Sequence, residues 1–133
     1  MLKTIWIFED NADNVEIYRE QLTGEWPNVD IQVFEFVTDA AHATGSPDIL
    51  FFDLSAIGGM LGSMGGPERY CCWISTLAMK HPGAIIVICS GHGRQFTTDI
   101  INEVLKETPD SVIHRIPYMD SLEELVKNLK AIL

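Results

Sequence analysis

Five apolar runs of strand length recur along this chain of 133 residues, and the stretches between them carry helical periodicity. Alternation of strands and helices is typical of parallel sheets, because the chain returns to the next parallel strand through a helix on one face. The five runs span residues 4–8, 31–37, 49–52, 84–89 and 112–116. The pattern therefore predicts an α/β fold with a five-stranded parallel sheet.

The polarity of the runs predicts their order in the sheet. Runs 4–8, 49–52 and 84–89 are apolar at successive positions, as expected for central strands that helices cover on both faces. The other two runs are expected at the edges because they carry polar residues, namely Gln32, Glu35, His114 and Arg115. With right-handed crossovers, this assignment favours the doubly wound order 2-1-3-4-5 of flavodoxin-like three-layer sandwiches. Strands one and three are then neighbours at the point where the winding reverses.

The intervening stretches predict five helices. Val15, Tyr18 and Leu22 fall on one face of the first helix, and Gly24 and Pro27 are expected to end it. The other four are expected over residues 39–43, 67–80, about 96–105 and 121–133, the last opened by a capping box. The glycine-rich residues 57–66 are expected to form a loop, since no Gly-Lys-Ser/Thr follows that would make them a phosphate-binding loop.

Three acidic residues stand where two central strands should end. Glu9 and Asp10 follow the first strand, and Asp53 follows the third. If these strands are parallel neighbours, the carboxylates meet at one edge of the sheet, where they repel one another unless a cation joins them. Because oxygen-rich acidic clusters suit Mg²⁺, the sequence predicts a metal-dependent acidic site. The plainer alternative is that Asp53 only caps a turn and that Asp10 only begins the first helix.

Composition disfavours several classes of function. Nine basic against nineteen acidic residues give a formal net charge of −10, which repels a phosphate backbone, so direct nucleic-acid binding is not expected. Cys71, Cys72 and Cys89 fit neither a disulfide framework nor a zinc spacing and are interpreted as buried thiols in a reducing cytoplasm. No run reaches transmembrane length, so we expect one soluble, cytoplasmic domain over residues 1–133 with no membrane partner.

Three short motifs carry a resemblance to a known family. They are Phe-Glu-Asp-Asn at residues 8–11, Asp-Ile-Leu-Phe-Phe-Asp-Leu at residues 48–54 and Ile-Cys-Ser-Gly at residues 88–91. An acidic pair after strand one, an Asp after strand three and a Ser with a small neighbour after strand four resemble the CheY-like receiver domains of response regulators. The resemblance covers the whole chain in the order and length of its elements.

The resemblance implies roles for the acidic residues. Asp53 would be the phosphoacceptor, which takes a phosphoryl group from a phosphohistidine on a histidine kinase or phosphotransfer protein. Mg²⁺ would be held by Asp53, Asp10, the backbone carbonyl of Ser55, and Glu9 acting through a water molecule. A metal that bridges the attacking carboxylate and the phosphoryl oxygens neutralises charge that the acidic cluster would otherwise repel.

The resemblance implies two further site residues after strand four. Ser90 would donate a hydrogen bond to the phosphoryl oxygens, and Gly91 would leave room for the phosphate because it has no side chain. Taken alone, Ser90 has a plainer interpretation as an ordinary hydroxyl at the end of a strand.

The chain departs from the family pattern around strand five. Receivers carry a Lys before a Pro there, and this chain has Ile116, whose apolar side chain cannot pair with phosphate. Arg115, Arg94 and His92 are the candidates to replace the Lys, although Arg115 should face the opposite side of its strand. Ile113 stands where receivers carry an aromatic switch residue, so the usual ring rotation is not expected.

Two functions follow from these observations. The first is a stand-alone receiver, phosphorylated on Asp53, that signals through altered binding of a downstream protein and catalyses at most its own slow phosphorylation and dephosphorylation. The second is a pseudo-receiver, an interaction module that does not depend on phosphorylation. For the first, the resemblance implies that the fourth helix, fifth strand and fifth helix bind a partner or form a homodimer. A small flavodoxin-like or hydrolytic enzyme is disfavoured, because the chain has no G-x-S-x-G, Walker or Gly-x-Gly-x-x-Gly motif.

Overall fold

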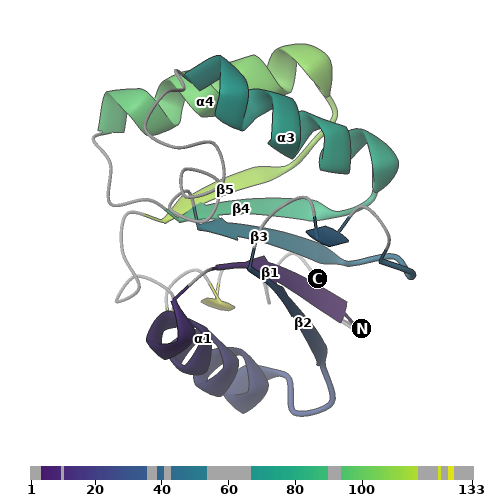
Figure 1. Cartoon of the computed structure of the whole chain (residues 1–133), viewed down its shortest axis with the longest axis vertical. Coiled ribbons are helices and arrows are strands. Elements are labelled where there is room, and N and C mark those ends of the chain that lie inside the picture. Colours follow the sequence, from purple (N-terminus) through teal and green to yellow (C-terminus); the bar gives the residue numbers. More distant parts are fainter. Residues whose placement is uncertain are drawn as a thin grey trace.

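Five parallel strands form the centre of the computed structural model, which describes residues 4–9, 11–35, 39–40, 43–53, 67–89, 94–116, 123 and 126–127. The strands are β1 (Thr4–Phe8), β2 (Asp30–Phe34), β3 (Ile49–Asp53), β4 (Ile85–Cys89) and β5 (Ile113–Ile116). Their order is β2-β1-β3-β4-β5, and every neighbouring pair is parallel. The predicted doubly wound α/β topology is confirmed, with the two polar runs at the edges (Figure 1).

β2 is the strand whose predicted bounds differ most from the structure. It ends at Phe34, whereas the sequence pattern extended it to residue 37; Glu35 is outside the strand, and residues 36–37 are outside the described part. The reason is that β1, the strand with which β2 pairs, ends at Phe8. Past that point the backbone N–H of Glu9 still donates to the carbonyl of Phe34 at 3.1 Å. The other four strands match their predicted bounds to within one residue.

The long helices in the described ranges are α1 (Ala12–Glu25), α3 (Pro67–Lys80) and α4 (Arg94–Glu107). α1 begins after Asn11, whose Oδ1 accepts hydrogen bonds from the N–H groups of Asp13 and Asn14 at 2.9 and 3.2 Å. The helix continues through Gly24, where the sequence predicted a stop, and ends before Pro27, which has no N–H to donate. None of the helical segments described is both long and apolar enough to cross a membrane.

The second and fifth predicted helices are described only in part. Asp39 and Ala40 lie in a 3₁₀ turn, and the N–H of Ala43 donates to the carbonyl of Ala40 at 3.1 Å. Gly45 follows with a φ of 104°, a backbone conformation that glycine adopts without strain. Residues 123, 126 and 127 of the last predicted helix are helical, and the rest of 121–133 lies outside the described part.

Side chains on the two faces of the sheet form separate apolar cores. One face packs against α3 and α4, and the other packs against α1 (Figure 1). Side chains alternate along β3, so that Leu50 and Phe52 face α3 and α4 whereas Ile49 and Phe51 face α1. The architecture is therefore three layers, and the alternation predicts that Asp53, the last residue of β3, faces α1.

Three phenylalanine rings form a stack across β2, β1 and β3 on the face toward α3 and α4. The ring centroid of Phe8 lies 5.3 Å from that of Phe34 and 4.7 Å from that of Phe52, with interplanar angles of 20° and 9°. Phe8 and Phe52 are fully buried. This phenylalanine stack lies at the carboxyl ends of the strands, because Phe8 directly precedes Glu9 and Phe52 directly precedes Asp53.

The prediction that all three cysteines are buried is wrong for Cys72. Cys71 and Cys89 are buried, whereas Cys72 is exposed. Neighbouring positions on a helix point about 100° apart, so a helix that covers a sheet turns one of two adjacent residues inward and the other toward solvent. Cys71 is the inward one and packs in the core between the sheet, α3 and α4.

Candidate functional site

The ends of β1 and β3 bring two of the predicted acidic residues together. Phe8 and Phe52 are paired in the parallel register, and Glu9 and Asp53 are the residues that follow them. The carboxyl ends of parallel strands lie at the same edge of a sheet, and the winding of the chain reverses between these two strands. Glu9 and Asp53 therefore stand side by side at the switch point of the sheet.

Glu9 is held at the start of α1. It is 2% exposed, and its Oε1 accepts a hydrogen bond from the backbone N–H of Asn11 at 3.0 Å. Asn11 is also the residue that caps α1. Because the N-terminus of a helix carries a partial positive charge, it stabilises a carboxylate in this position. The side chain of Glu9 is thus fixed between the end of β1 and the first turn of α1.

Asp53 contacts two residues that the sequence analysis left outside the site. The hydroxyl of Tyr18 on α1 donates to Oδ2 of Asp53 at 3.3 Å and lies 3.5 Å from Sγ of Cys89. Cys89 ends β4 and pairs with Asp53 in the register of the sheet. Tyr18 is fully buried, Cys89 is 4% exposed and Asp53 is half-buried. The three side chains form one group on the α1 face, here called the Tyr18–Asp53–Cys89 cluster.

Burial and negative charge change the acid–base properties of this cluster. Burial raises the pKa of the Tyr18 hydroxyl far above its ordinary value, and the contact with Cys89 and the charges of Asp53 and Glu9 raise it further. Burial raises the pKa of the Cys89 thiol to about 11; the hydrogen bond between Cys89 and Tyr18 opposes this rise, whereas Asp53 and Glu9 add to it. At neutral pH both groups are therefore protonated, and the carboxylates impose a negative potential on the cluster.

The end of β5 shares a row of the sheet with Asp53. Asp53 pairs with Cys89, and Cys89 pairs with Ile116, whereas Arg115 pairs with Ile88 in the preceding row. Ile88 packs on the face toward α3 and α4, away from Tyr18. The register therefore includes Ile116 in the row that contains Asp53 and leaves Arg115 out of it.

Several predicted site residues lie outside the described part of the structure. They are Asp10, Ser55, Ser90, Gly91 and His92. Arg94 is the first residue of α4. The roles that the resemblance implies for these residues stay predictions.

Tyr18 and Cys89 each carried a signal that sequence reasoning did not use. Tyr18 is the one residue with a polar tip among the three on the inner face of the first helix, and a buried tyrosine hydroxyl usually finds a hydrogen-bond partner. Cys89 is the last residue of the strand expected beside the one that Asp53 ends. These signals mark the two residues as candidates, but neither of them gives the contact with Asp53.

The donor atoms of the described residues fit a hard divalent cation. Glu9 and Asp53 supply carboxylate oxygens, the ligands that Mg²⁺ prefers, and the protonated thiol of Cys89 offers no competing thiolate. No three His, Cys, Asp or Glu side chains within the described ranges are arranged to hold a metal. The third predicted carboxylate, that of Asp10, is outside those ranges. The structure thus supplies two of the predicted ligands in a negative environment.

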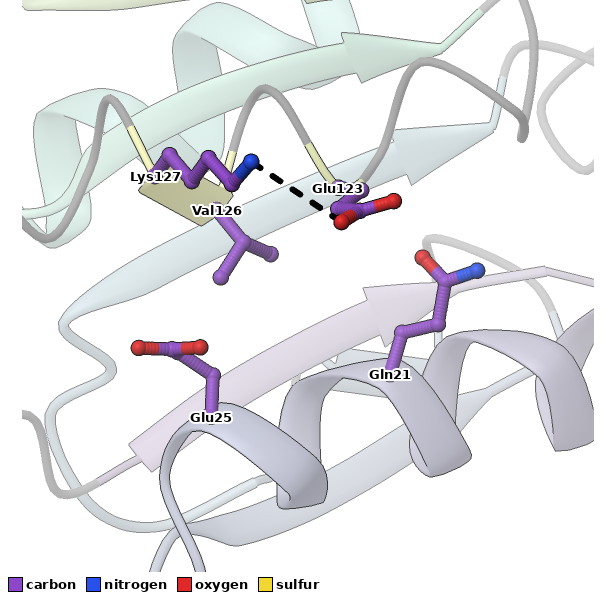
Figure 2. Close-up of a pocket in the computed structure, with 5 residues that line it drawn as sticks. All are labelled: Gln21, Glu25, Glu123, Val126 and Lys127. Atoms are coloured by element: carbon purple, nitrogen blue, oxygen red, sulfur yellow. Dashed lines mark ion pairs between the residues drawn. The ribbon is translucent and has the colours of Figure 1, made fainter.

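A separate hollow of about 240 Å³ lies between α1 and the helical residues near the carboxyl end of the chain (Figure 2). Gln21 and Glu25 line it from α1, and Val126 lines it from the opposite side. Lys127 forms an ion pair with Glu123 at 3.9 Å, but both side chains are largely exposed, so the pair stabilises little. None of the described residues that line the hollow belongs to the Tyr18–Asp53–Cys89 cluster.

Comparisons with solved structures identify the fold. A response regulator from Thermotoga maritima is similar with a TM-score of 0.64 at 16% identity, covering 98% of this chain and 99% of that one. An orphan response regulator of H. pylori gives 0.65 at 13% identity, with 97% and 94% covered. The phosphorylated cyanobacterial phytochrome response regulator RcpA gives 0.65 at 17% identity, with 99% and 94% covered. No family model matches the chain, and no curated protein matches it significantly.

The chain therefore has the CheY-like fold of response-regulator receiver domains, as the motifs in its sequence suggested. At identities of 13 to 17% the likeness concerns the fold alone. Since one fold hosts many functions, the function has to be argued from the site.

Proposed function

We propose that this chain is a receiver that accepts a phosphoryl group on Asp53 from a phosphohistidine of a histidine kinase or phosphotransfer protein. One observation carries the proposal: Asp53 ends β3 at the switch point of a receiver fold, beside Glu9 at the end of β1. Ligands of open α/β sheets bind at this point. The likeness to a phosphorylated cyanobacterial response regulator supports the same proposal.

In the proposed reaction, a carboxylate oxygen of Asp53 attacks the phosphorus in line with its bond to the imidazole nitrogen. That bond breaks, its electron pair returns to the ring, and an acyl phosphate forms on Asp53. Glu9, Asp10, Asp53 and the carbonyl of Ser55 would hold Mg²⁺, which when bound neutralises charge on the phosphoryl oxygens. Glu9 is suited to this role because its bond with the N–H of Asn11 keeps its carboxylate at the site.

Ser90 and Gly91 complete the proposed site from the end of β4. The hydroxyl of Ser90 would donate to a phosphoryl oxygen, and Gly91 would leave space beside it. The only catalysis that we propose is slow self-phosphorylation and self-dephosphorylation of Asp53.

The proposed output is altered binding of a downstream protein. A phosphoryl group shifts the balance between two conformations only if it interacts differently with each of them. The surface formed by α4, β5 and the last helix is proposed as the site where a partner or a second copy binds. We propose a cytoplasmic location, where phosphohistidine donors act and where the free thiols of Cys71 and Cys89 stay reduced.

A pseudo-receiver is the second candidate, and the end of β5 favours it. Ile116 shares the row of Asp53, and Arg115 does not, so among the described strand residues that row holds no cation to pair with a phosphoryl group. A pseudo-receiver would keep the fold and bind its partner without regard to phosphorylation. The two candidates therefore differ in whether Asp53 ever carries phosphate.

Intact mass after incubation with a small phosphodonor and Mg²⁺ separates the two candidates. The receiver is expected to gain the mass of one phosphoryl group, and the gain should vanish in Asp53→Asn and in the presence of a chelator. Asp30→Asn is the matched control, because it removes an exposed carboxylate at the start of β2, at the opposite end of the strand from the site. Binding of Mg²⁺ with no adduct would instead establish the pseudo-receiver, and an adduct that persists in Asp53→Asn would refute the assignment of the acceptor.

A further inference from the structure

Tyr18 brings a hydroxyl group from α1 to the carboxyl group of Asp53. Its ring is fully buried and packs against Phe51 with centroids 4.7 Å apart. Its hydroxyl donates to Oδ2 of Asp53 at 3.3 Å and lies 3.5 Å from Sγ of Cys89. A phenylalanine would fill the same apolar space without burying a polar atom, so packing alone does not explain a tyrosine here.

The hydroxyl has a single proton and donates it to one neighbour at a time. When Asp53 is ionised, its carboxylate is the stronger acceptor, because hydrogen bonds to charged groups are stronger than those to neutral groups. The thiol of Cys89, a weak donor, can then donate to the Tyr18 oxygen. When Asp53 carries a phosphoryl group, its carboxyl oxygens belong to an uncharged acyl group and accept more weakly. The hydrogen bond from Tyr18 is therefore stronger to bare Asp53 than to phosphorylated Asp53.

We propose that the Tyr18 hydroxyl shortens the lifetime of the phosphoryl group on Asp53 by stabilising the carboxylate that leaves during hydrolysis. This inference rests on the proposed function, since Asp53 must first accept a phosphoryl group.

In the hydrolysis step, water attacks the phosphorus, and the bond between the phosphorus and the Asp53 oxygen breaks. The electron pair of that bond stays on the carboxyl group, and the proton of the water passes to the released phosphate. The new charge spreads over both carboxyl oxygens, so a donor at Oδ2 stabilises it whichever oxygen held the phosphorus. An interaction that is stronger in the transition state than in the ground state accelerates the step.

The separation of the two oxygens limits the size of the effect. A distance of 3.3 Å is long for a hydrogen bond between a hydroxyl and an oxygen acceptor, for which about 2.7 Å is usual. Tyr18→Phe, which removes the hydroxyl and keeps the ring, is therefore expected to slow the loss of phosphate by about three- to tenfold.

The experiment phosphorylates the full chain with a small phosphodonor and Mg²⁺, removes the donor, and follows the decay of the adduct by intact mass. Wild type, Tyr18→Phe and Thr23→Ala are compared. Thr23 is the matched control, since it also carries a hydroxyl on α1, but it is exposed and donates to the backbone carbonyl of Arg19 at 2.6 Å. Its variant should lose phosphate at the wild-type rate. Thermal unfolding of each variant shows that it is folded.

A second variant covers the case in which Tyr18→Phe does not fold. With Tyr70 and Tyr118 changed to Phe, biosynthetic 3-fluorotyrosine occupies position 18 alone. The fluorinated phenol keeps the ring and is a stronger donor, so the adduct should decay faster than in the same background with ordinary tyrosine. The two substitutions thus change the lifetime in opposite directions.

The outcomes separate this inference from the proposed function. An adduct that decays more slowly in Tyr18→Phe, or faster with fluorotyrosine, supports the role of Tyr18. Equal decay in all variants overturns it while the proposed function stands. A wild type that never forms an adduct refutes the proposed function, and the inference falls with it.

Discussion

The thiol of Cys89 should resist alkylation at neutral pH, whereas the exposed thiol of Cys72 should react readily. Burial, assisted by the charges of Asp53 and Glu9, raises the pKa of Cys89 from 9.0 to about 11. Thiolates are the reactive species, so at about pH 8 roughly one Cys89 in a thousand is reactive, against about one in ten for an ordinary thiol. The raised pKa alone slows the reaction of Cys89 by about a hundredfold, and the low accessibility of its side chain, which is 4% exposed, slows it further.

The alkylation rate of Cys89 should increase with pH. Because the folded protein holds Cys89 in its neutral form, its alkylation rate should rise about tenfold for each pH unit and level off only near the pKa of about 11. Asp53→Asn removes one of the negative charges that raise this pKa, so the variant should react faster than wild type at the same pH. The reactivity of Cys89 thus reports the charge on Asp53.

The assay is timed labelling with iodoacetamide, followed by digestion and mass spectrometry of the peptides that contain each cysteine. Cys71, which is buried in the other core, is the internal control, since the charge on Asp53 should not alter its rate. Comparable labelling of Cys72 and Cys89 at neutral pH would refute the burial of β4, and an unchanged Cys89 rate in Asp53→Asn would refute its electrostatic contact with Asp53.

Two further substitutions test how local structure is built. Asn11→Ala removes the side chain that caps α1 and should lower the free energy of unfolding, measured by urea denaturation, by about 1 kcal/mol. The control Asn28→Ala, at an exposed turn, should change this free energy little. Equal effects of the two substitutions would contradict the cap. Gly45→Ala should also lower the free energy of unfolding by about 1 kcal/mol, because a φ of 104° strains any residue that has a Cβ. Steric contact does not contribute, since no atom in the described part of the chain lies within 4 Å of the Cβ position. Gly83→Ala, which has the same free space but no positive φ, should lower the free energy of unfolding by less.

Much of the fold was predictable because the burial of a strand determines the pattern of apolar residues in its sequence. Strands covered on both faces are apolar at successive positions, and that pattern separated β1, β3 and β4 from the two edges. The end of β2 was not predictable from its own residues, since it depends on where β1 stops. Likewise, Gly24 lowers helix propensity, but the hydrogen bond from the N–H of Trp26 to the carbonyl of Leu22 carries α1 past it.

The candidate site was predictable to the extent that strand ends determine it. Glu9 and Asp53 follow apolar runs, and parallel pairing alone brings such residues to one edge. Tyr18 was not predictable as a neighbour of Asp53, because the reach of its hydroxyl depends on how α1 is rotated and how closely it packs on Phe51. Cys89 required the register between β3 and β4, which no single strand encodes.

The phenylalanine stack has a mechanical consequence for this edge of the sheet. Three stacked rings, two of them fully buried, resist sliding of β2, β1 and β3 past one another. They do so one residue before Glu9 and Asp53 along the strands. A chemical change on Asp53 therefore takes place next to a tightly packed, rigid part of the sheet. The sheet itself should therefore absorb little of any displacement that follows a chemical change on Asp53.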